Sequence, residues 1–295
     1  MIGTPVERLA LYFGAMRTRQ GILARAALGT PDAGDAELAE ELAAGMAAEL
    51  RADGSAGGAA VPTIWRAHEL LDLGRPPSDP AVARVLEWLM ERQGKPGAYG
   101  EGCDKARHAQ RLCEHWLRGF FAPAAVTERL APITLPNGKV YRAEPAARFA
   151  ISCLGLRAAL RAGFGDRPGV VQHLESLREL AEQWTGWTGF FAPDVIVAGL
   201  HALTLGGPSY RETVRTLVDM VAAHQREDGL WPSADLFATL EALLASGLPA
   251  AHAAVRRTLP ALGERQRVDG TLGPTAQQER ALIGLRALLW AETAA

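Results

Sequence analysis

Six short turns, each marked by a glycine, recur along this chain at nearly constant spacing. In each case a stretch with helical periodicity ends at the turn, and a second apolar helix begins about six residues later. Successive marker glycines lie 40 to 51 residues apart. A period in this range is typical of a repeat architecture built from helical hairpins. The marker glycines are Gly54, Gly97, Gly138, Gly189, Gly229 and Gly270.

The fifth repeat shows how each unit is built. Residues 235–246 carry leucines at helical spacing and stop at Gly247, and residues 250–266 form a second helix before the turn at Gly270. Strand signals are nearly absent, and the helices that follow the marker glycines are the more apolar set. Since a helix that is apolar on most faces is buried, we predict an all-α fold. It is an α/α toroid, a closed double ring of six hairpins with these helices inside; an open solenoid of the same hairpins is the alternative.

The bulk properties narrow the class of protein. The repeat fills the chain from Gly54 onward, which predicts a single toroid domain over residues 1–295 with one extra helix near residues 5–26. A net charge of −2 argues against a nucleic-acid partner. No segment approaches the ~18 uninterrupted apolar residues of a transmembrane helix, and residues 1–23 lack the layout of a signal peptide. With three cysteines in a chain that needs no disulfides, we expect a cytoplasmic protein, and the richness in Ala, Arg and Gly resembles bacterial proteins of high GC content.

Two of the turns carry a sequence motif. Residues 225–231 (Gln-Arg-Glu-Asp-Gly-Leu-Trp) and 266–272 (Gln-Arg-Val-Asp-Gly-Thr-Leu) resemble the Gln-x-x-Asp-Gly-x-Trp repeats of squalene–hopene cyclases and protein prenyltransferase β subunits. The resemblance implies the toroid fold and an enzyme that acts on an isoprenoid or another small hydrophobic substrate in a central cavity, as a cyclase, an isomerase or a transferase. The Asp-x-Asp-Asp motif with which these cyclases protonate an alkene is absent. No catalytic residue of the family can therefore be carried over to this chain.

Parallel inner helices would begin at one mouth of a central cavity. Four repeats have a cysteine or an acid at the equivalent position, five or six residues after the marker glycine: Cys103, Glu144, Asp194 and Asp235. As helix caps these groups would only stabilise helix starts. If they converge, they could act in acid–base catalysis or hold a cation. We take all four as candidate catalytic groups.

Three arginines follow one helical turn deeper, ten residues after the marker glycine. They are Arg107, Arg148 and Arg280. They either pair with the acids or clamp a diphosphate, carboxylate or sulfate group of a substrate. Trp65 is a further candidate for substrate binding, because its ring could line the cavity and stabilise a carbocation.

Residues 102–116 hold two of the three cysteines and two of the seven histidines. One chemical interpretation is a nucleophile pair of Cys103 and His108. Another is a divalent metal, Zn²⁺ or Mg²⁺, bound by Cys103, His108 and Asp235. An inert cysteine and ordinary helix histidines are the structural interpretation. Protein prenyltransferases hold zinc with Asp, Cys and His on the fold implied by the motif, but their Asp-x-Cys is missing here.

Two classes of function follow from these observations. The first is an enzyme with its site in the central cavity, acting on a small hydrophobic substrate. The second is a non-catalytic toroid that binds a small molecule or a protein partner. Charged groups that converge on an open pocket favour the enzyme, whereas a centre packed with Leu and Ala favours the binding protein.

Overall fold

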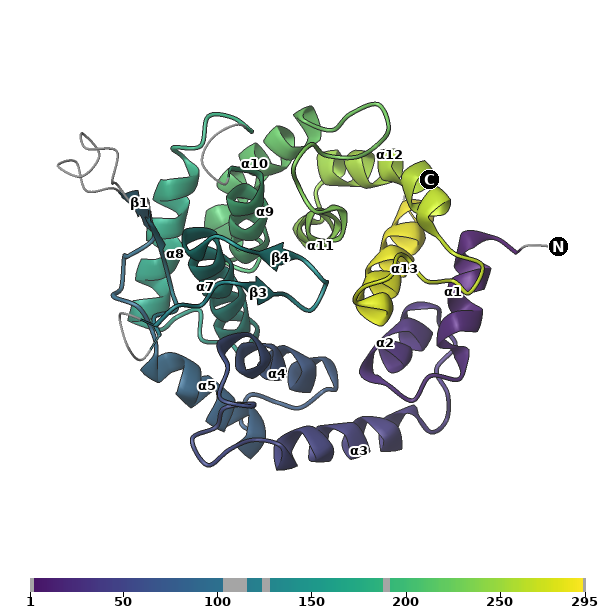
Figure 1. Cartoon of the computed structure of the whole chain (residues 1–295), viewed down its shortest axis with the longest axis horizontal. Coiled ribbons are helices and arrows are strands. Elements are labelled where there is room, and N and C mark those ends of the chain that lie inside the picture. Colours follow the sequence, from purple (N-terminus) through teal and green to yellow (C-terminus); the bar gives the residue numbers. More distant parts are fainter. Residues whose placement is uncertain (1–2, 103–115, 124–127, 188–191, 294–295) are drawn as a thin grey trace.

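The computed structural model describes residues 3–102, 116–123, 128–187 and 192–293 and shows a closed double ring of helices (Figure 1). Neighbouring inner helices pack against each other around the ring, and the outer helices cover them. The all-α toroid is thereby confirmed. The outer helices are α1 (Pro5–Gly14), α3 (Asp35–Ala48), α5 (Pro80–Glu91), α8 (Pro168–Ala181), α10 (Arg211–Ala223) and α12 (Pro249–Arg265). The inner helices are α2 (Arg19–Ala27), α4 (Ala60–Asp72), α7 (Glu144–Arg161), α9 (Ala192–Leu203), α11 (Leu236–Ser246) and α13 (Gln277–Thr293).

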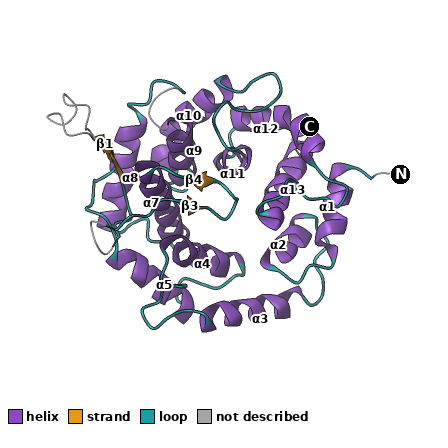
Figure 2. Cartoon of the chain, in the orientation of Figure 1, coloured by secondary structure: helices purple, strands orange, loops and turns teal. Residues whose placement is uncertain are grey.

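Strands form a small part of the described chain (Figure 2). β1 (Gly100–Gly102) pairs in antiparallel fashion with β2 (Trp116–Arg118) at the edge of the ring, and β3 (Ile133–Thr134) pairs with β4 (Val140–Tyr141) near its centre. A short 3-10 helix, Pro208–Tyr210, precedes α10. No helix within the described ranges is long and apolar enough to cross a lipid bilayer.

The inner ring differs from the sequence prediction at one place. Five inner helices follow marker glycines as predicted, but the chain after Gly97 enters β1 instead, and α4 packs directly against α7. The sixth inner position is filled by α2. The single extra helix predicted near residues 5–26 is wrong, because the chain turns at residues 15–18 and two helices form. Thr18 begins the second of them by accepting a hydrogen bond from the N–H of Gly21.

Two marker glycines show why the turns need this residue. Gly229 and Gly270 have φ angles of 76° and 87°, a left-handed region that glycine enters without steric cost. A Cβ added at Gly229 would lie 2.3 Å from the carbonyl oxygen of Arg257, and one at Gly270 would lie 2.7 Å from that of Arg8. Each turn therefore packs directly on the next outer helix, which fixes one repeat against the following one.

The ring closes where α1 and α2 pack against α13 (Figure 1), a junction that we call the seam. The buried guanidinium of Arg19 on α2 forms ion pairs with Glu279 on α13 and with Asp72 on α4, so one side chain joins three inner helices. A small core, separate from the main one, fills the seam, and α1 takes the place of the sixth outer helix. The buried side chains of this core are Leu9, Phe13, Ala24, Ala281, Leu282 and Leu285.

Candidate functional site in the ring centre

Residues 128–141 cross one mouth of the ring, and we call them the strap. The strap contains β3 and β4, which lie over the central region in Figure 1. Side chains in the first turns of α7, α9 and α13 all bind it, so these inner helices begin at the same mouth. The strap tip reaches the ring centre, where Pro136 and Asn137 line two cavities.

Glu144 and Arg148 of α7 hold the beginning of the strap. The Glu144 carboxylate accepts hydrogen bonds from the backbone N–H groups of Leu130 (2.9 Å) and Ala131 (2.8 Å). It also forms an ion pair with Arg148 at 2.6 Å, and Arg148 donates a hydrogen bond to the carbonyl of Glu128. Both side chains are thus occupied by the strap in this structure. The proposed acid–base role of Glu144 and the anion-binding role of Arg148 remain predictions.

Asp194 and Arg280 hold the rest of the strap, and Asp235 lies beside Arg280. Asp194 forms an ion pair with Lys139 at 2.6 Å. Asp235 caps α11 and lies 3.7 Å from Arg280, whose Nε donates a hydrogen bond to the carbonyl of Asn137 at 2.8 Å. Burial raises the pKa of Asp194, and the nearby charge of Asp235 adds to this, although Lys139 acts in the opposite direction. The three predicted acids therefore gather around the strap, and their catalytic roles remain predictions.

The other predicted site residues have different outcomes. Cys103, Arg107 and His108 lie outside the described residues. Trp65 lines a cavity in the ring centre. In the part of the chain that the structure describes, no group of three His, Cys, Asp or Glu side chains is arranged to hold a metal ion. The zinc or magnesium site of Cys103, His108 and Asp235 stays a prediction, because two of its three ligands fall outside that part.

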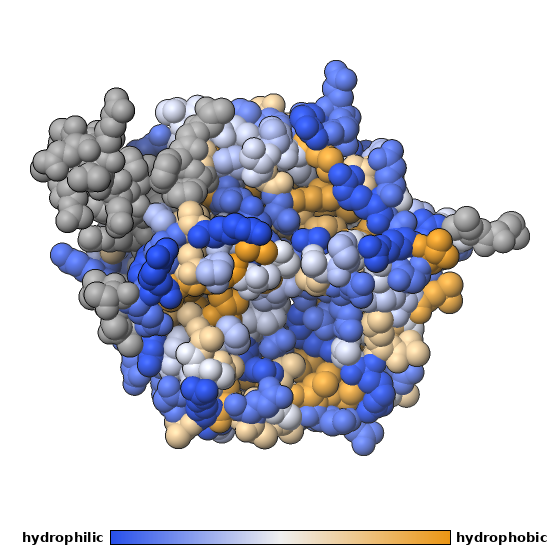
Figure 3. Space-filling model, viewed as in Figure 1, coloured by the Kyte–Doolittle hydropathy of each residue, from blue (hydrophilic) through white to orange (hydrophobic). Residues whose placement is uncertain are grey.

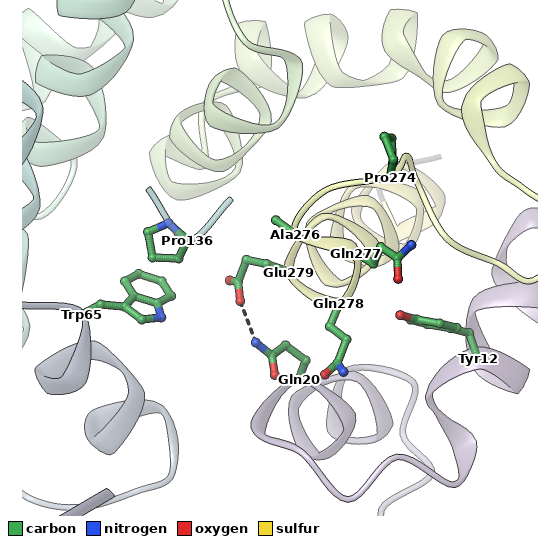
Figure 4. Close-up of a pocket in the computed structure, with 9 residues that line it drawn as sticks. All are labelled: Tyr12, Gln20, Trp65, Pro136, Pro274, Ala276, Gln277, Gln278 and Glu279. Atoms are coloured by element: carbon green, nitrogen blue, oxygen red, sulfur yellow. Dashed lines mark hydrogen bonds between the residues drawn. The ribbon is translucent and has the colours of Figure 1, made fainter. Parts of the chain in front are cut away.

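An open cavity of about 560 Å³ lies beside the strap tip, between α1, α2, α4 and α13. In Figure 4, Trp65 and Pro136 face Glu279 across this space, and Gln20 donates a hydrogen bond to Glu279 at 3.0 Å. Figure 3 shows that this face of the molecule is hollowed at its centre, with hydrophilic side chains around the hollow. The open cavity is large enough for a small molecule, and it combines an aromatic wall with a polar one.

A second, smaller cavity of about 30 Å³ lies under the strap, between α7, α9 and α11, and we call it the inner cavity. Leu135 and Asn137 of the strap contribute to its lining, and most of the remaining lining is apolar. Each of the three helices adds one charged or imidazole side chain, namely Arg157, His201 and Glu241. Side chains with acid–base and anion-binding chemistry therefore converge under the strap.

The carboxyl group of Glu241 has a raised pKa. Burial raises its pKa above the ordinary value for glutamate, and the charge of Glu279 adds to this effect. Arg157 and the hydrogen bond that Asn137 donates to its Oε2 at 2.7 Å favour the ionised form, but burial outweighs them. The result is a carboxyl group that holds its proton to higher pH than an exposed glutamate does.

Two other arginines of the inner helices, Arg161 and Arg19, have carboxylate partners. Arg161 forms an ion pair with Asp72 at 2.6 Å and donates a hydrogen bond to Nδ1 of His68 at 3.0 Å. The other ring nitrogen of His68 lies 3.1 Å from a backbone carbonyl of α7, to which it donates. Burial, together with the charges of Arg157 and Arg161, lowers the pKa of His68 well below its usual value. His68 is therefore neutral, and Asp72 is shared between Arg161 and Arg19.

Arg157 has no comparable partner. None of the hydrogen bonds or ion pairs between described residues involves its guanidinium, and its Nε is buried without an acceptor. Burial lowers its pKa, which the charge of Glu241 partly offsets, but an arginine remains protonated in proteins. His201 lies beside it in the lining, and burial and the Arg157 charge lower the pKa of His201 well below its usual value. The inner cavity thus contains an unpaired cation next to a neutral imidazole.

Comparison with solved structures identifies proteins of similar fold. A variant of the type II terpene cyclase MstE from Scytonema, in complex with its substrate geranylgeranyl dihydroxybenzoate, superposes with a TM-score of 0.59 at 14% sequence identity, covering 98% of this chain and 88% of that one. A second variant, bound to the product merosterolic acid A, gives 0.56 at 13% identity, covering 99% and 87%. A protein from Actinoplanes gives 0.53 at 17% identity, covering 97% and 88%. No protein-family model and no curated protein matches the chain. The resemblance to terpenoid cyclases is therefore confirmed for the fold.

The residues of the inner cavity were not among the sequence candidates, although the sequence marks them. Arg157 is the one charged residue between Phe149 and Leu160, and Glu241 is the one charged residue of α11. His201 is the one ionisable residue that follows Asp194 in α9. A lone charge or imidazole in a buried helix requires a partner or a function. That signal points to the three side chains that share the inner cavity.

Proposed function

We propose that this protein is an enzyme that binds an isoprenoid, or a similar small hydrophobic molecule, in the ring centre and protonates one of its double bonds to start a cyclisation or an isomerisation. Glu241 is the general acid. The observation that carries the proposal is the convergence of Arg157, His201 and Glu241, the lone charged or imidazole groups of three apolar helix segments, on one cavity. A bacterial cytoplasmic location is part of the same proposal.

Glu241 has the surroundings that alkene protonation requires. Its raised pKa keeps a larger share of the carboxyl protonated near neutral pH. The carboxyl O–H bond breaks as the proton joins one alkene carbon, and the other carbon becomes a cation that the next double bond of the same molecule attacks. Loss of a proton from the final cation completes the reaction, so the product is an isomer of the substrate. Apolar side chains such as Leu154 and Val197 line the cavity around the cation, and Trp65, which lines the neighbouring open cavity, can stabilise positive charge that develops on the part of the chain bound there.

The substrate must displace the strap to reach Glu241. A space of about 30 Å³ is roughly the volume of one water molecule, whereas the open cavity beside the strap tip is large enough for an isoprenoid chain. The contacts of Lys139 with Asp194 and of Arg280 with the Asn137 carbonyl involve side chains, and they can break while β3 and β4 stay paired. In this proposal the acids and arginines at the mouth control access, and Glu241 performs the chemistry.

The similarity to MstE supports an isoprenoid substrate, since that cyclase is seen with a geranylgeranyl compound. The polar open cavity and the charged inner cavity support an enzyme over a toroid with a filled apolar centre. Proposed metal chemistry at Cys103 and His108 is a separate question, which the metal content of the purified protein would answer.

The test is turnover of linear prenyl compounds in D₂O. We expect the product to have the connectivity of a cyclised or isomerised substrate and to carry one solvent deuterium at the protonated carbon. Glu241→Gln keeps the size and the hydrogen bond to Asn137 but has no acidic proton, so the rate should fall by about 10²-fold or more. The matched control is Glu264→Gln on the exposed face of α12, which should retain full activity. Turnover without deuterium, or an active Glu241→Gln protein, would refute the proposal; binding without any turnover would favour the non-catalytic toroid.

A further inference from the structure

Two arginines of the ring centre are paired with carboxylates. Arg19 and Arg161 are cations, and Asp72 and Glu279 supply the carboxylates that pair with them. These four groups form one connected network across α2, α4, α7 and α13. A network of paired charges needs no ligand to compensate it.

Arg157 stands outside this network. It lies one helical turn before Arg161 on α7, lines the inner cavity and has no ion pair or hydrogen bond among the described residues. The nearest carboxyl group, that of Glu241, is bound by Asn137 instead. An unpaired guanidinium is costly to keep in a cavity, so its retention there is explained if a ligand supplies the missing negative charge.

We propose that Arg157 is an anion-binding residue, and that the substrate of this protein is an amphipathic molecule whose apolar chain ends in a carboxylate or diphosphate group bound by Arg157. His201, which lines the same cavity and has a neutral ring, donates a hydrogen bond to the same group. Carboxylates and phosphates each present two oxygen atoms that can accept two parallel hydrogen bonds from one guanidinium group. The apolar side chains that line the cavity between Arg157 and Glu241 accommodate the first carbons of the substrate chain.

The proposal deepens the proposed function. The apolar chain of the substrate rests on that function, whereas the anion site rests only on the surroundings of Arg157. Both groups of the substrate are then held in one cavity. The anionic end lies against Arg157 and the reacting double bond lies near Glu241. An anion at Arg157 also neutralises the charge that favours ionisation of Glu241, so a bound substrate would help the acid to keep its proton.

Binding of three matched probes tests the proposal. Farnesyl diphosphate, farnesoate and farnesol share one chain and differ in the head group, and their dissociation constants are measured by calorimetry on the full-length protein. We expect at least one anionic probe to bind about tenfold or more tightly than farnesol, because a charge-assisted hydrogen bond contributes about that much to affinity. The anionic probe that binds more tightly identifies the head group. Arg157→Gln should remove this preference and leave farnesol binding within about twofold. Arg157→Lys should restore part of it, and Arg215→Gln, exposed on α10, should change nothing.

The melting temperature of the unliganded variants separates a binding role from a structural one. Replacing an arginine that stabilises the fold lowers the melting temperature. Replacing an unpaired cation raises the melting temperature, because the free-energy cost of burying the charge disappears. We therefore expect Arg157→Gln to melt above the wild type without ligand. Equal binding of the three probes, an unchanged preference in Arg157→Gln, or a lower melting temperature of that variant would each overturn the proposal, whereas an active Glu241→Gln protein would refute only the proposed acid.

Discussion

Arg8 and Gln266 join the two sides of the seam. Nε and Nη2 of Arg8, on α1, donate hydrogen bonds to Oε1 of Gln266 at 2.9 and 2.6 Å. The same contact occurs one repeat earlier, where Nε of Arg257 donates to Oε1 of Gln225 at 2.8 Å. The glutamine in each pair begins the Gln-x-x-Asp-Gly motif, and the arginine belongs to the next outer helix. The motif therefore works as a connector between repeats, and α1 receives the last connector as the outer helix that follows α12.

Replacing Arg8 tests whether this connector closes the ring. Arg8→Ala should lower the free energy of unfolding by about 1–3 kcal/mol, since hydrogen bonds from a charged donor to a partly buried acceptor are lost. The measurement is urea unfolding. Arg257→Ala removes the equivalent contact away from the seam and is the matched control. We expect hydrogen exchange to rise in α1 and α2 for Arg8→Ala only; the same exchange pattern in both variants would contradict the role of the seam.

Gly229→Ala tests the packing of a turn on the next outer helix. The substitution meets both a φ of 76° and a carbonyl oxygen at 2.3 Å, so it should cost about 2–4 kcal/mol in the free energy of unfolding. Gly57→Ala is the control, because Gly57 also has positive φ (64°) but an added Cβ would meet nothing within 4 Å. It should cost only about 1 kcal/mol. Equal losses would mean that the close approach contributes nothing.

The strap should loosen when its ion pair to α9 is removed. Lys139→Gln leaves the partly buried carboxylate of Asp194 without its cation, and we expect faster hydrogen exchange in residues 128–141. Lys95→Gln, at an exposed position, should leave this exchange unchanged. If access to the ring centre requires strap movement, Lys139→Gln should also speed the association of a prenyl probe. Unchanged exchange in the strap would show that the ion pair does not hold it.

The raised pKa of Glu241 predicts how stability depends on pH. A carboxyl group whose pKa is higher in the folded than in the unfolded protein binds more protons when folded, so its contribution is present at low pH and is lost as the pH rises through the folded value. Wild type should therefore lose stability relative to Glu241→Gln as the pH rises above the usual glutamate range. Melting curves of both proteins over pH measure this difference. The same titration should reduce the rate of the wild-type enzyme at higher pH, and parallel stability profiles would show that Glu241 has an ordinary pKa.

The ring could be predicted from sequence because its connectors are local. Glycine-marked turns and apolar periodicity reveal five of the six inner helices, but the hairpin of α1 and α2 has no Asp-Gly turn, so its place in the ring depends on contacts with α13 that lie far away in sequence. The equivalent positions of Asp194 and Asp235 in their repeats also indicated that their helices begin at the same mouth of the ring. The strap that binds them could not be foreseen, since its position depends on long-range contacts such as that of Lys139 with Asp194. Arg157 and Glu241 lie beyond the two positions, about six and ten residues after each marker glycine, to which the register argument was limited.

The seam has a consequence for how the chain reaches this structure. At the junction of α4 with α7, His68 and Leu154 are separated by 86 residues, whereas at the seam Arg19 and Glu279 are separated by 260 and Arg8 and Gln266 by 258. Contacts of such separation form late, because the entropy of closing a long loop must be overcome before they contribute. We therefore expect an open arc of hairpins to assemble first, with its central groups exposed to solvent, and the ring centre to become a cavity only in the final step of folding.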